Sequence, residues 1–70
     1  MNELYAMARR FQRDHYRQAS ISMVADGVEA VALAMSDFAH GESESARLEL
    51  QRATACLKAA AGYRILSLLA

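Results

Sequence analysis

The chain has 70 residues, 54% of them hydrophobic, and a net charge of zero. Its length is about half that of a usual domain, which excludes separate catalytic and regulatory domains. Zero net charge gives little support to a protein that binds nucleic acid through charge. A chain this short usually needs disulfides, a metal or oligomerisation to be stable.

The sequence favours neither disulfides nor a metal site. Cys56 is the only cysteine, which excludes an intramolecular disulfide and favours a reducing compartment. We interpret it as a small buried apolar side chain rather than a reactive thiol. His15 and His40 are far apart in the sequence, and we interpret Asp37 with His40 as a solvated helix end. We therefore expect no metal and no cofactor, and oligomerisation remains as the source of stability.

The sequence also predicts a soluble, cytoplasmic protein. Arg9 and Arg10 interrupt the N-terminal segment, and no apolar region of the signal-peptide type follows them. The most apolar stretches, Gly27–Met35 and Ile65–Ala70, are shorter than the roughly 20 residues that cross a bilayer. We expect no membrane partner.

Strong helix formers fill the chain, and residues that break helices cluster only once, near the middle. This pattern predicts an all-α, two-helix antiparallel hairpin that forms a single domain over residues 1–70. We expect the first helix at about 2–39, the turn at 40–44 and the second helix at about 45–69. Gly41 is placed to adopt a left-handed conformation after the first helix, and Ser43 or Ser45 is placed to cap the second.

The first helix carries two apolar sets that face different directions. One set recurs at heptad spacing, which is typical of a helix seam, and comprises Ile21, Val24, Val28, Val31, Met35 and Phe38. The other set, Leu4, Met7, Ala8 and Phe11, is rotated from it by roughly 140° at 100° per residue. We predict one long helix that contacts different neighbours at its two ends. Gly27 has two interpretations, close approach of another backbone or mere tolerance.

The second helix carries two apolar stripes. The first comprises Ala46, Leu50, Ala53, Leu57, Ala60 and Leu68, and the second comprises Leu48, Ala55, Ala59, Gly62, Leu66 and Leu69. Such a helix needs neighbours on two sides, and one hairpin supplies only one. We therefore predict a homodimeric four-helix bundle, in which Leu50, Leu57, Leu66 and Leu69 join the seam of the first helix as dimer or core contacts. The sequence does not decide which stripe is intramolecular.

Charge is distributed in three blocks along the chain. Residues 1–20 hold four arginines against two carboxylates, residues 21–45 hold five carboxylates alone, and residues 46–70 hold four basic side chains against one carboxylate. A hairpin that turns within the acidic block has an acidic turn end and basic far ends, which suits antiparallel self-pairing.

Arg9, Arg13 and Arg17 form a basic stripe at helical spacing, and Tyr16 lies beside it. One interpretation is a solvated helix face. A second is recognition of a partner protein, since arginine and tyrosine dominate interface hot spots. The alternative is a helical dimer that grips nucleic-acid phosphates, although no helix-turn-helix spacing supports it.

The sequence has no convincing catalytic pattern. Asp14 and His15 are adjacent and point in different directions on a helix, and Gly27, Gly41 and Gly62 make no phosphate loop. We therefore expect a non-enzymatic module that binds a partner protein as a regulator or inhibitor. Small size and hairpin form are shared by many short regulators of bacteria and their phages, including anti-activators and inhibitors that block a host protein. The apolar end, residues 63–70, is expected to close the dimer core or to bind that partner.

Overall fold

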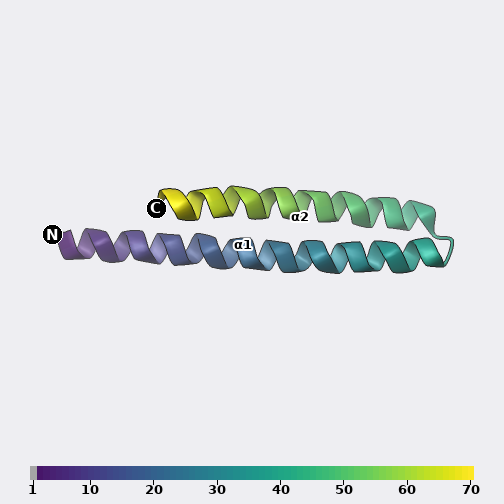
Figure 1. Cartoon of the computed structure of the whole chain (residues 1–70), viewed down its shortest axis with the longest axis horizontal. Helices are drawn as coiled ribbons and strands as arrows, with labels where there is room; N and C mark the ends of the chain where they lie inside the picture. The colour runs from purple at the N-terminus through teal and green to yellow at the C-terminus, as the bar shows by residue number, and fades with distance from the viewer. Residues whose placement is uncertain (1) are drawn as a thin grey trace.

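The computed structural model describes residues 2–70 and forms a hairpin of two antiparallel α-helices (Figure 1). Helix α1 spans Asn2–Ala39 and α2 spans Ser43–Leu69. The hairpin is a rod of 60 × 12 × 11 Å. The prediction of an all-α, two-helix antiparallel hairpin is therefore confirmed.

The turn between the helices is built by Gly41. Its φ of 78° lies in the left-handed region, where a side chain would be strained. The Gly41 N–H donates to the Phe38 carbonyl at 3.1 Å, and the Glu42 N–H donates to the Asp37 carbonyl at 2.8 Å. This pair of bonds is the Schellman arrangement, and it satisfies carbonyls that the end of a helix leaves free.

Helix α2 begins two residues before the predicted start. Its N-cap residue is Glu42, and no side chain caps the helix there, so the expected capping by Ser43 or Ser45 is wrong. Instead, the Ser45 hydroxyl donates to the Asp37 carboxylate of α1 at 2.7 Å. Ser45 does not cap α2 because its hydroxyl bonds across the turn to α1 instead of to its own helix.

Small side chains form the contact between the two helices. The buried residues, here called the small-residue seam, are Gly27, Ala30 and Ala34 of α1 and Ala46, Ala53, Ala60 and Ser67 of α2. Their spacings of three, four and seven place them on one face of each helix. Ala30 is fully buried. Because small residues let two helices approach closely, larger side chains are displaced to the flanks.

Gly27 lies at a point of close approach between the helices. A methyl group added there would lie 3.1 Å from two carbons of the Leu57 side chain and 3.5 Å from the Ala53 carbonyl oxygen. The tightest contact at this glycine is therefore with the Leu57 side chain, and the nearest backbone atom lies at an ordinary contact distance. The neighbouring backbone is the chain's own α2.

The first helix extends well beyond the end of the second (Figure 1). The Arg13 guanidinium donates to the Ala70 carbonyl at 3.4 Å, which marks where α2 ends alongside α1. Every described residue before Tyr16 is exposed. We call residues 2–12 the arm. Helix α1 runs through the polar segment 13–22 without interruption, in agreement with the absence of glycine and proline before Gly27.

Helix α1 is also long enough, and apolar enough over one stretch of 18 residues, to cross a membrane by length and composition. Only 22% of that stretch is buried within the hairpin. This stretch is longer than the segments Gly27–Met35 and Ile65–Ala70, on which the prediction of no membrane span was based. The same helix carries the acidic residues Asp26 and Glu29.

The tight small-residue seam predicts that a larger side chain at its centre is destabilising. Ala30→Leu should lower the free energy of unfolding by about 1–3 kcal/mol, because the added methylenes have no space between the helices. Urea unfolding followed by circular dichroism measures the change. Ala25→Leu, the same substitution at an exposed position of α1, is the matched control and should have little effect. Equal stability of the two variants would contradict the seam.

Candidate interaction surfaces

One flank of the hairpin carries a continuous row of large apolar side chains, here called the apolar face. It comprises Ile21, Val24, Val28, Val31, Met35 and Phe38 of α1 with Leu50 and Leu57 of α2. The seam predicted from heptad spacing is thus mostly outside the hairpin. Val31 is half-buried, whereas Val28 is 62%, Met35 69% and Phe38 73% exposed. These residues are therefore not the core of the hairpin.

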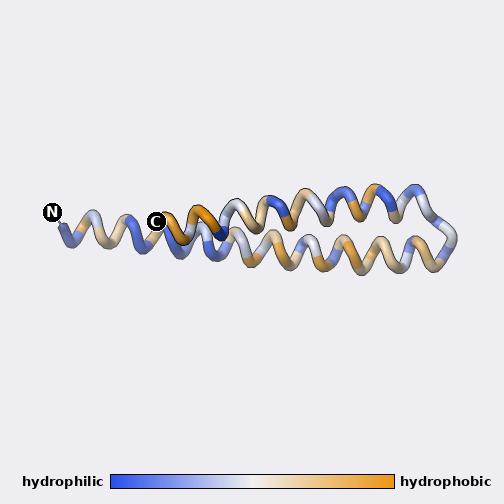
Figure 2. Tube along the Cα trace, turned by 45° about the horizontal axis from the view of Figure 1, so that its top comes forward, coloured by the Kyte–Doolittle hydropathy of each residue, from blue (hydrophilic) through white to orange (hydrophobic). Residues whose placement is uncertain are grey.

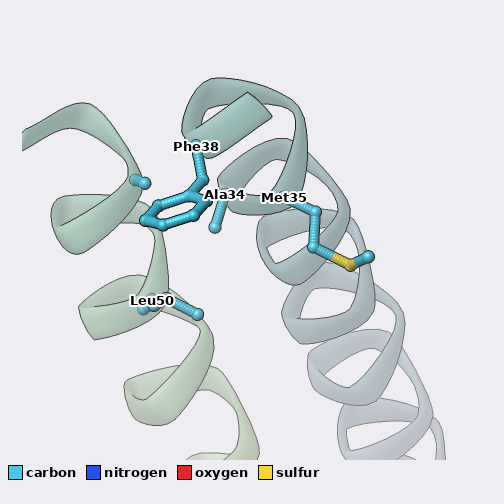
Figure 3. A pocket seen from close by; sticks show the side chains of 5 residues that line it. Ala34, Met35, Phe38 and Leu50 are labelled. Atoms are coloured by element: carbon cyan, nitrogen blue, oxygen red, sulfur yellow. The ribbon is translucent and has the colours of Figure 1, made fainter. Parts of the chain in front are cut away.

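Two shallow grooves run along the apolar face. One is lined by Met35, Phe38 and Leu50 with two alanines of the small-residue seam, and Figure 3 shows the Phe38 ring extending toward α2. The next is lined by Val28, Val31, Met35 and Leu57, among others. Met35 lines both grooves, so they form one apolar strip between the helices. The strip offers no chemistry beyond apolar contact.

Leu66 and Leu69 belong to a different surface. Leu66 follows Leu57 by nine residues, which is half a turn round the helix, and it lines a separate groove with Ile65, Tyr63 and Gly62. Leu69 is 73% exposed. Figure 2 shows the apolar end of α2 beside a polar stretch in the N-terminal half of α1. The ten predicted seam residues therefore divide into two surfaces, eight on the apolar face and two near the end of α2.

The predicted arginine stripe lies at the start of α1. Arg9 and Arg13 line one shallow hollow with Arg10 and Tyr5. The Arg9 guanidinium carbon lies 5.7 Å from the centre of the Tyr5 ring, within range of a cation–π contact. Arg17 pairs with Asp14 at 3.3 Å, and both side chains are exposed. Arg9, Arg13 and Arg17 are thus all accessible, but Arg17 lies outside the hollow.

Tyr16 is engaged inside the hairpin. Its ring is half-buried and stacks on Tyr63 of α2, with ring centres 6.3 Å apart and an angle of 22° between the planes. One turn further along, the Ser20 hydroxyl donates to the Ala60 carbonyl at 2.9 Å. These contacts hold the open end of the hairpin together. Tyr16 therefore has a structural role beside its predicted role in partner binding.

The described residues contain no cluster of three or more metal-ligating side chains. His40 bonds the Ser36 carbonyl through Nδ1 at 2.7 Å, and Asp37 accepts the Ser45 hydroxyl, so neither side chain is directed at a shared ion. Cys56 is half-buried beside the seam. The only resolved pKa change within residues 2–70 raises the pKa of Arg47 through its hydrogen bond to Glu44.

Sequence reasoning did not identify the small-residue seam of α1. The signal was available, because Gly27, Ala30 and Ala34 recur at spacings of three and four, and half-buried Ser20 and Met23 continue the same spacing toward the start of α1. It was overlooked because the neighbouring heptad of valines, methionine and phenylalanine is far more hydrophobic. Tyr63 was expected to make contacts as part of the apolar end, but its stacking on Tyr16 of the same chain was not predicted.

No family model, curated protein or solved structure matches the chain.

The stacked tyrosines predict a difference between two aromatic residues of α1. Tyr16→Ala should lower the free energy of unfolding by about 1–2 kcal/mol, since it removes an aromatic pair and half-buried ring area. Tyr5→Ala, in the exposed arm, should change stability by less than about 0.5 kcal/mol. Thermal unfolding of both variants is the measurement. An unaffected Tyr16→Ala variant would show that the ring does not stabilise the hairpin.

Proposed function

We propose that the chain is a non-enzymatic protein-interaction module that pairs with a second copy through its apolar face into a four-helix bundle. As a dimer it binds a partner protein and regulates or inhibits it. The observation that carries the proposal is the exposure of large side chains along the apolar face, while the hairpin interior is built from alanine, glycine and serine.

Large apolar side chains contribute more free energy when they are buried than the small ones inside the hairpin do. A buried methyl group contributes roughly 0.8 kcal/mol, whereas covering a whole valine, leucine, methionine or phenylalanine side chain contributes about 1.5–3 kcal/mol. Most of the large apolar side chains therefore remain exposed to solvent in one hairpin. A helix pair that lies on the apolar face would give it the second layer of an ordinary bundle.

A protein surface is a better cover for this face than a lipid bilayer. Asp26 and Glu29 lie on the helix that carries the face. Placing an aspartate at the centre of a bilayer costs about 2.5–3.5 kcal/mol on insertion scales. In a four-helix bundle these two carboxylates stay in water, because they lie on a different side of α1 from Val24, Val28 and Val31.

The arm supports binding of a partner protein. Arg9 and Arg10 of the arm line the hollow with exposed Tyr5, and α2 covers none of these three side chains. Phe11 of the arm is also exposed, and Arg13, just after the arm, lines the same hollow. Arginine with an aromatic side chain is the composition of interface hot spots. The same arginines suit phosphate binding, which keeps a nucleic-acid-binding dimer as the alternative. The arm also carries Glu3, which opposes phosphate contact, and no second basic element lies alongside it.

The dimer proposal predicts a mass in solution of twice the 7.7 kDa of one chain. Sedimentation equilibrium at micromolar concentration measures it. Val28→Glu should raise the dimer dissociation constant at least about tenfold, because a carboxylate from each copy would be desolvated in the interface. Glutamate favours the helix, so the hairpin itself should fold.

Ser22→Glu is the matched control, since it adds the same charge to an exposed position off the apolar face. It should leave the mass unchanged. A folded wild-type monomer would overturn the proposed dimer, and its binding to neutral phospholipid vesicles would assign the face to a membrane instead.

Binding of a partner protein and binding of nucleic acid predict different responses to salt. Titration with duplex and single-stranded oligonucleotides at two salt concentrations should give no micromolar binding, because the arm offers only a few phosphate contacts. Binding that falls steeply with salt, with a log–log slope near −0.9 per neutralised phosphate, would establish the alternative. Alanine at Arg9 and Arg13, which lie outside the apolar face, should leave the dimer mass unchanged.

A further inference from the structure

We propose that the second copy lies on the apolar face in antiparallel orientation, with the turn of each hairpin beside Arg17 and Arg64 of the other. This inference rests on the proposed dimer and adds its orientation and register. The observations that carry it are the extent of the apolar face and the opposite charge of the two halves of the rod.

The apolar face fixes the register. On α1 it runs from Ile21 to Phe38, about 26 Å at 1.5 Å per residue, and so covers only the half of the 60 Å rod nearer the turn. Arg17 precedes the face on α1, and Arg64 follows it on α2. Two such faces cover one another fully only if the two-fold axis passes near Val28 and Val31.

This register brings the turn of one copy to a defined place on the other. If the axis lies midway between Ile21 and Phe38, Ile21 of one α1 lies opposite Phe38 of the other. By the same symmetry, the turn residues that follow Phe38 lie opposite residues 17–19. The arm projects beyond the turn of the partner and stays available.

Charge selects between the two orientations that bury the face. The Ser20–Ala60 bond divides the rod near its middle. Residues 1–20 with 60–70 carry five arginines against two carboxylates, whereas residues 21–59 carry six carboxylates against three basic side chains. A parallel pair would bring Glu42 and Glu44 of one copy against the same residues of the other. The antiparallel pair brings them to Arg17 and Arg64, which is the complementary arrangement.

Disulfide pairing distinguishes the orientations. Ile21→Cys and Phe38→Cys are made in separate chains, each with Cys56→Ser, mixed in a glutathione buffer and analysed by mass spectrometry. Antiparallel pairing places position 21 of one chain near position 38 of the other, so the mixed disulfide should far exceed the half that random pairing gives. A parallel pair holds the two positions about 26 Å apart, beyond the roughly 7 Å that a disulfide spans.

The disulfide pattern and the mass in solution together separate the orientation of the dimer from its existence. Like-with-like disulfides, or no mixed disulfide in a sample that sediments as a dimer, overturn the antiparallel orientation while the proposed dimer stands. A sample that sediments as a folded monomer, with the wild type also monomeric, overturns the proposed dimer and this inference together.

Charge reversal gives a second measurement that leaves the apolar face intact. Glu42→Arg should raise the dimer dissociation constant about 3- to 10-fold, since it sets like charges opposite Arg17 and Arg64. Adding Arg17→Glu to the same chain should restore most of the affinity. Glu3→Arg is the matched control, because the arm lies beyond the partner's turn, and it should have no effect. Tighter dimerisation of Glu42→Arg would show that turn lies against turn and overturn the inference.

Discussion

Close packing of two helices along small side chains is the constraint on which the rest of this structure depends. Alanine, glycine and serine let α1 and α2 approach until a methyl group at Gly27 would lie 3.1 Å from Leu57. At that separation no large side chain fits between the helices. Valine, methionine, phenylalanine and leucine therefore lie on the flanks, and the hairpin is left with an interior that buries little apolar area.

The same constraint organises the surfaces. The apolar face follows the seam at a constant offset, because both repeat at heptad spacing along the same helix. The lengths of α1 and α2 differ, and that difference produces the arm, where aromatic and arginine side chains stand without a neighbouring helix. The apolar face and the exposed arginines of the arm thus lie in different halves of one rod. A protein organised in this way can assemble through one half and bind through the other.

Charge gives the rod a direction. Carboxylates gather near the turn and arginines near the open end, and three ion pairs between neighbours on the same helix neutralise only part of each group. Such exposed pairs contribute little to the stability of one hairpin. In the proposed dimer, complementary ends would select the orientation of the second copy and like ends would oppose it.

The sequence by itself determined the two helices, the single turn and its glycine, because helix propensity and the Schellman arrangement are local properties. It also identified the residues of the apolar face as a heptad set. Only the tertiary structure decided that this set lies outside the hairpin. Hydrophobic periodicity tells which side chains share a face of a helix, but not which of two adjacent heptads contacts the neighbour. Ala30 and Ala34, and not Val28 and Met35, face α2, because small side chains allow the closer approach of the backbones.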